Sequence, residues 1–142
     1  SYNTGMMISA AVHLYDATAE ERYLNQAKRF AQAGFETFAT QTSAGVYEFT
    51  DVPWFDKLLF EGFLDLYPYD TATVGEYIAE VERTMDYAWE NSRNDEGYIS
   101  PAWVSGWSDA YRYKSVLDHS STAEMYAMLA QYHLGLTEES NA

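Results

Sequence analysis

The sequence predicts an all-α protein in which buried inner helices alternate with outer helices that lie on the surface. Three segments are apolar nearly all round, which is typical of helices buried on all sides. Two other segments are apolar on one face only, which is typical of surface helices. The two kinds alternate along the 142 residues, and this is the order of a two-layered array of antiparallel helices.

The first two predicted helices cover residues 4–16 and 19–39. The inner one is apolar nearly all round over residues 6–15. The outer one has apolar side chains close to the spacing i, i+3, i+4, i+7, with charged residues opposite. A capping box that begins at Thr18 predicts where it starts, because threonine can cap a backbone N–H while an acid three residues later reaches back.

The remaining helices are predicted over 55–67 (inner), 73–92 (outer) and 120–134 (inner). Capping boxes that begin at Thr73 and Ser121 predict two of the starts. Gly62 lies inside an apolar helix, where we expect it to let two helices approach closely. Trp89 has the helical spacing of a core residue in the second outer helix.

The predicted connections differ in length. Inner helices lead into outer helices through short loops, whereas the return connections, about 40–54 and 92–120, are long. If consecutive helices run antiparallel, both long loops emerge at the end of the array where the inner helices begin. Long loops in compact domains are usually functional, and these are rich in tyrosine and tryptophan. We therefore expect an aromatic rim there, with a short β-hairpin near residues 45–50.

Composition excludes several kinds of partner. The formal net charge is −14, which argues against nucleic acid and anionic membranes, since both select basic surfaces. No run approaches the roughly 18 apolar residues of a membrane span. With no cysteine, disulfides and thiolate metal sites are excluded. The three histidines do not form a metal set, so we predict no metal and no cofactor.

Several motifs occur in a characteristic order. They are Tyr-Asn-x-Gly at residues 2–5, Glu-Arg-Tyr-Leu at 21–24, Trp-Phe-x-Lys at 54–57, Asp-Glu-Gly-Tyr at 95–98 and Leu-Asp-His-Ser-Ser at 117–121. With them the chain resembles glycoside hydrolase family 76, the α-1,6-mannanases, over nearly its whole length. The resemblance implies an (α/α)6 toroid, a carbohydrate substrate similar to α-mannan and, for a polysaccharide substrate, a secreted or cell-envelope location.

Two departures from the family pattern limit what the chain can do. It supplies about five helices where the toroid has twelve, and it lacks the family's pair of adjacent catalytic aspartates, which lies upstream of the Tyr-Asn-x-Gly helix. We therefore expect residues 1–142 to be one incomplete domain, the C-terminal half of the barrel. Its partner would be the missing N-terminal half. We assign no catalytic residue and predict that the chain alone is inactive.

The candidate sugar-binding residues lie at inner-helix starts or in the long loops, so we expect them to converge around one concavity. Tryptophan offers a flat apolar face to a pyranose ring, and the helix dipole disfavours Lys57 in a first turn, which suggests a partner or ligand. Asp51, Asp56 and Asp118 are the carboxylates expected at this end. The predicted cleft residues are Tyr2, Asn3, Trp54, Lys57, Tyr98, Trp103, Trp107, Asp118 and His119.

Two other functions remain open from the residues alone. One is a sugar epimerase or unsaturated-uronyl hydrolase on the same toroid. Such epimerases use paired histidines, whereas here only His119 is expected at the open end. The other is a non-catalytic module of helical hairpins that binds peptides or glycans, which would require self-similar repeats. The sequence upstream of Ser1 would discriminate among the three.

Overall fold

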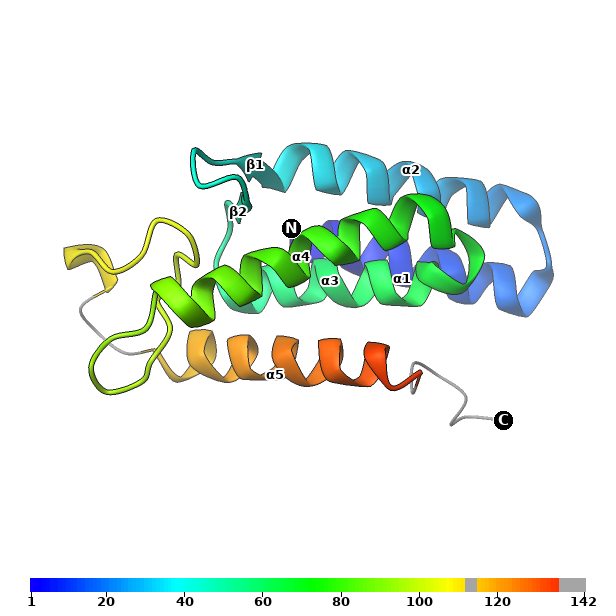
Figure 1. Ribbon diagram of the computed structural model, residues 1–142. Coiled ribbons are helices and arrows are strands. Elements are labelled where there is room, and N and C mark those ends of the chain that lie inside the picture. The colour runs from blue at the N-terminus through cyan, green and yellow to red at the C-terminus, as the bar shows by residue number, and fades with distance from the viewer. Residues whose placement is uncertain (112–114, 136–142) are drawn as a thin grey trace.

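The computed structural model describes residues 1–111 and 115–135. Within these residues the chain is almost entirely helical, with one short antiparallel hairpin (Figure 1). The helices are α1 (Tyr2–Thr18), α2 (Glu21–Phe38), α3 (Pro53–Leu66), α4 (Thr71–Asn91) and α5 (Val116–His133). The strands are β1 (Ala39–Gln41) and β2 (Tyr47–Phe49), and two 3₁₀ turns, η1 (Tyr67–Tyr69) and η2 (Asp109–Tyr111), complete the elements.

The predicted all-α, two-layered arrangement is confirmed. Helix α3 lies between α1 and α5, so these three form the inner layer, while α2 packs on α1 and α4 packs on α3 (Figure 1). The core runs along α3, where Leu59, Phe60, Phe63 and Leu66 are fully buried. In the described part of the chain, no helix is long and apolar enough to cross a membrane.

The predicted capping boxes are wrong: α4 and α5 are capped by other polar residues, and α2 has no side-chain cap. The Asp70 side chain accepts a hydrogen bond from the Thr73 backbone N–H and caps α4. Ser115 caps α5 in the same way, so this helix begins at Val116, earlier than predicted. Thr18 ends α1 instead of opening α2.

The expectation that Trp89 belongs to the core is also wrong. Its side chain is 47% exposed, although Met85 and Ala88 in the same helix are fully buried. Trp89 lies at the boundary of the apolar face of α4, where its ring contacts the Tyr126 ring of α5 at a centroid distance of 5.9 Å. The guanidinium of Arg93 lies 4.3 Å from the centre of the indole.

Candidate functional site: an aromatic end of the helical array

The inner helices begin at the same end of the molecule as both long loops (Figure 1). One loop contains the β1–β2 hairpin, which confirms the predicted strand pattern. The other loop runs from the end of α4 to the start of α5. This arrangement follows from antiparallel helices joined alternately by short and long connections, and it gathers most of the predicted site residues near one end.

A carboxylate joins the two long loops. Glu48 in β2 accepts hydrogen bonds from the backbone N–H of Val104 and of Ser105, the latter at 2.6 Å, and from the Ser105 hydroxyl at 2.7 Å. The Thr84 hydroxyl of α4 donates to the Tyr47 carbonyl at 2.7 Å. The hairpin is therefore fixed both to the second loop and to an outer helix.

Trp103 corrects one of the predicted sugar contacts. It is 1% exposed, its Nε1–H donates to the Thr122 hydroxyl at 3.3 Å, and its carbonyl accepts from the Ser92 hydroxyl at 2.6 Å. The ring packs edge-on to Phe49. Trp103 thus holds the loop down on the core, and no face of its ring is available to a sugar.

Tyr2 and Trp54 lie together at the starts of α1 and α3. The Tyr2 ring stacks on Phe55 with centroids 4.5 Å apart, and Phe55 contacts Trp54 at 3.7 Å. Sequence reasoning missed Phe55, although its position beside Trp54 was a usable signal. Asn3 is exposed on the first turn of α1, whose N-cap is Ser1.

Lys57 has the partner that its unfavourable position in a helix first turn suggested. Its ammonium lies 3.2 Å from Glu124 of α5 and 3.5 Å from Glu61 of α3. Burial by itself lowers the pKa of Lys57, but the two carboxylates outweigh it and hold the pKa above its usual value. Lys57 therefore links two inner helices.

Asp51 and Asp56 have opposite environments. Asp51 accepts from the Ser1 amino group at 2.8 Å and the Val52 N–H at 3.1 Å. Burial alone would raise the pKa of Asp51, but these hydrogen bonds lower it below its usual value. Asp56 is 2% exposed, and neither carboxylate oxygen has a hydrogen-bond partner. Burial, assisted by the Asp51 charge, raises the pKa of Asp56 to about 7, so Asp56 carries its proton well into the neutral range.

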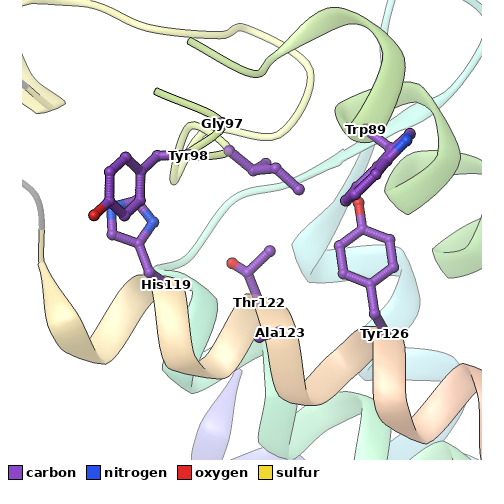
Figure 2. A pocket seen from close by; sticks show the side chains of 8 residues that line it. Trp89, Gly97, Tyr98, His119, Thr122, Ala123 and Tyr126 are labelled. Carbon is purple, nitrogen blue, oxygen red and sulfur yellow. The ribbon is translucent and has the colours of Figure 1, made fainter. Parts of the chain in front are cut away.

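A pocket of about 190 Å³ opens between the end of α4, the turn that follows it and the first half of α5 (Figure 2). Tyr98 and His119 are the predicted site residues that line it, with ring centroids 4.9 Å apart. His119 also contacts the half-buried Trp107, whose Nε1–H donates to the Ser92 carbonyl. The full lining is Trp89, Gly97, Tyr98, Ile99, His119, Thr122, Ala123 and Tyr126.

The predicted site residues thus fall into two groups and not around a single pocket. Tyr2, Asn3, Trp54 and Lys57 lie at the starts of α1 and α3, whereas Tyr98, Trp107, Asp118 and His119 lie beside α5. Asp118 occupies the first turn of α5, where its N–H is capped by Ser115. Among the residues that the structure describes, no cluster of three acidic or histidine side chains could hold a metal ion.

Sequence comparison decides the family. The model of glycosyl hydrolase family 76 matches residues 1–133. The chain belongs to glycoside hydrolase family 76. Among curated proteins, no sequence matched the chain. The family 76 match agrees with the motifs at the starts of α1 and α3 and with the alternation of inner and outer helices.

Solved structures of family 76 proteins have the same fold. One is a family 76 glycoside hydrolase from a bovine Bacteroides thetaiotaomicron strain, with a TM-score of 0.79 and 25% identity, covering 93% of this chain and 29% of that one. The α-mannanase of Bacteroides thetaiotaomicron gives a TM-score of 0.73 and 25% identity over 97% of this chain and 37% of its own. A family 76 mannosidase from the same species gives a TM-score of 0.78 and 24% identity, and the match covers 94% of this chain and 37% of the mannosidase. The chain therefore spans about a third of the length of these structures.

Proposed function

We propose that this chain forms part of the sugar cleft of a glycoside hydrolase that cleaves α-mannan. The observation that carries the proposal is the family 76 match over residues 1–133, and similar structures include a mannosidase and an α-mannanase. The aromatic residues at the starts of the inner helices add the surface chemistry that pyranose rings favour. This family evidence favours a hydrolase over the epimerase and helical-hairpin alternatives. With a polysaccharide substrate, we favour a secreted or cell-envelope location.

The catalytic acids would come from outside this chain. Hydrolysis with retention needs two carboxyl groups about 5 Å apart on either side of the scissile bond. The sequence contains no pair of adjacent aspartates. Asp56 is buried, with an exposed fraction of only 2%. We therefore propose that residues 1–142 supply cleft walls and bind substrate, but do not break the glycosidic bond.

The partner that fits best is the remainder of the same toroid. The inner helices α1 and α5 carry exposed apolar side chains that include Met6, 57% exposed, and Val116, 84% exposed. Apolar surface of this kind is normally covered by a partner. Because the chain spans 29–37% of the family structures compared above, the rest of a family 76 domain has the length to cover both helices.

The test compares two proteins on α-1,6-mannan, with release of reducing ends as the readout. A longer protein that contains this chain and the upstream part of the domain should hydrolyse the polymer, and the 142-residue chain should not. Absence of hydrolysis by the longer protein would overturn the proposed function. Turnover by the 142-residue chain would instead show that its own carboxylates are catalytic.

A further inference from the structure

The pocket beside α5 has aromatic rings at two opposite ends and small residues between them. Figure 2 shows Tyr98 and His119 at one end and Trp89 and Tyr126 at the other, with Thr122 and Ala123 of α5 between them. Trp89 and Tyr98 are both exposed, so the pocket is open to solvent at its rim. Such a shape accepts a ring-shaped ligand whose C–H faces contact aromatic surfaces.

The walls are held in place before any ligand arrives. The Tyr126 hydroxyl donates to the Met85 carbonyl at 2.7 Å. On the opposite side, the Asn94 side chain accepts from the Tyr98 backbone N–H at 3.0 Å and shapes the turn. This turn needs Gly97, whose φ of +87° lies in the left-handed region that favours glycine. A preformed pocket lowers the ordering cost of binding.

One polar atom in the pocket wall lacks a partner. His119 Nε2 is buried and makes no hydrogen bond with any described residue. A buried unsatisfied ring nitrogen is costly, and a ligand hydroxyl that reached it would remove that cost for either tautomer, because a hydroxyl can donate as well as accept. The Tyr126 hydroxyl has acceptor capacity left after its donation to Met85. The pocket therefore offers hydrogen bonds suited to hydroxyl groups.

The charge and size of the pocket limit which ligands it can bind. Among the described residues that line the pocket there is no lysine, arginine, aspartate or glutamate, and the whole chain carries a net charge of −14. The volume of about 190 Å³ is on the scale of a single sugar ring. We propose that this pocket binds a single uncharged hexopyranose unit between its aromatic ends, as one subsite of the cleft. The proposal rests on the proposed function.

The experiment is an NMR titration of the 142-residue chain with methyl α-D-mannopyranoside, observed at the Trp89 indole and His119 imidazole signals. Ala123→Leu fills the space between the aromatic ends. Ala127→Leu is the matched control, because Ala127 is also exposed, lies one turn further along α5 and does not line the pocket. We expect saturable shifts with a dissociation constant on the order of millimolar in the parent and control chains.

The predicted signature is at least tenfold weaker binding in Ala123→Leu and unchanged binding in Ala127→Leu. The methyl glycoside of glucuronic acid should also bind at least tenfold more weakly than the mannoside. The inference is overturned if the two signals do not respond, if Ala123→Leu binds as well as the parent, or if the charged sugar binds equally. Failure here with mannan hydrolysis by the longer protein would remove this subsite but leave the proposed function intact.

Discussion

Gly5 of α1 and Gly62 of α3 face each other where these two inner helices are in contact. A Cβ on Gly62 would lie 2.8 Å from the Gly5 carbonyl oxygen, and one on Gly5 would lie 2.0 Å from the Leu58 carbonyl oxygen. The obstructing atoms are backbone atoms, which cannot rotate away as a side chain can. The sequence predicted a close helix approach at Gly62, and this is confirmed.

Gly5→Ala should therefore lower the free energy of unfolding by at least about 3 kcal/mol, because the helices must separate to admit the methyl group. Gly75→Ala is the matched control, since this helical glycine has only a Tyr67 ring carbon nearby, at 3.4 Å from the added Cβ. In the control, the free energy of unfolding should rise by about 0.5–1 kcal/mol, because alanine has a higher helix propensity than glycine. Urea unfolding followed by circular dichroism measures both. Equal effects of the two substitutions would contradict the close packing of α1 on α3.

Asp56 should make stability fall as pH rises through the acidic range. The ordinary pKa is 3.8 and burial raises the pKa in the folded protein to about 7. Between these values the unfolded chain releases a proton that the folded chain keeps. The full stability is therefore present below pH 3.8, and this contribution of Asp56 is lost as pH rises to about 7. At about 1.4 kcal/mol per pKa unit, the loss reaches about 4 kcal/mol.

Asp56→Asn should remove this dependence. Relative to the parent chain, the variant should gain stability progressively between pH 4 and 7, and the gain should level off above pH 8. Asp95→Asn, at an exposed turn, is the matched control. Chemical denaturation across the pH range is the measurement. Profiles of Asp56→Asn and the parent that stay parallel would show that Asp56 ionises normally.

Trp103 and Trp54 should respond differently to truncation. Trp103→Ala should cost about 3–5 kcal/mol of stability, because it leaves a large cavity beneath the loop and removes the partner of Thr122. Trp54 is 37% exposed, so Trp54→Ala should cost much less stability. In the longer protein, Trp54→Ala should weaken mannan-oligosaccharide binding by about 1–3 kcal/mol. Thermal unfolding and calorimetric titration separate the two effects, and loss of stability in Trp54→Ala alone would reverse this assignment.

Glu48→Gln should loosen the junction of the two long loops. The glutamine amide keeps only one acceptor oxygen for the donors from Val104 and Ser105. We therefore expect the free energy of unfolding to fall by about 1–3 kcal/mol. Proteolysis between residues 101 and 108 should accelerate in this variant. Glu90→Gln, on the exposed surface of α4, is the matched control. An unchanged cleavage rate in Glu48→Gln would mean that other contacts fix the loop.

The two tryptophans that sequence reasoning misplaced show what local patterns can and cannot predict. Apolar periodicity predicted each of the five α-helices found in the described residues, because burial of a helix face repeats along the chain. The periodicity could not show which of Trp89 and Trp103 is more deeply buried. Trp89 has the spacing of a core residue but is half exposed, while Trp103, in a loop, is fully buried. Each outcome depends on how the second long loop folds onto α4 and α5, which is a tertiary contact.

The candidate site was predictable to a similar extent. Placement of Tyr98 and His119 near one end followed from the loop lengths and helix directions alone. The pocket itself did not, because one end of it is formed by Trp89 and Tyr126, which meet only through packing of α4 beside α5. Helix starts were missed for a simpler reason. Several polar residues near each start could act as the cap, and backbone geometry selected Asp70 over Thr73 and Ser115 over Ser121.

Three consecutive residues of α5 have three different surroundings. Thr122 accepts from the Trp103 indole of the loop, Ala123 lines the pocket, and Glu124 pairs with Lys57 of α3. A slide of α5 along its axis by one residue, about 1.5 Å, would break both contacts and change the shape of the pocket at once. The axial register of α5 is therefore set jointly by the second long loop, through Trp103, and by α3, through Lys57, and each of these contacts opposes the same displacement.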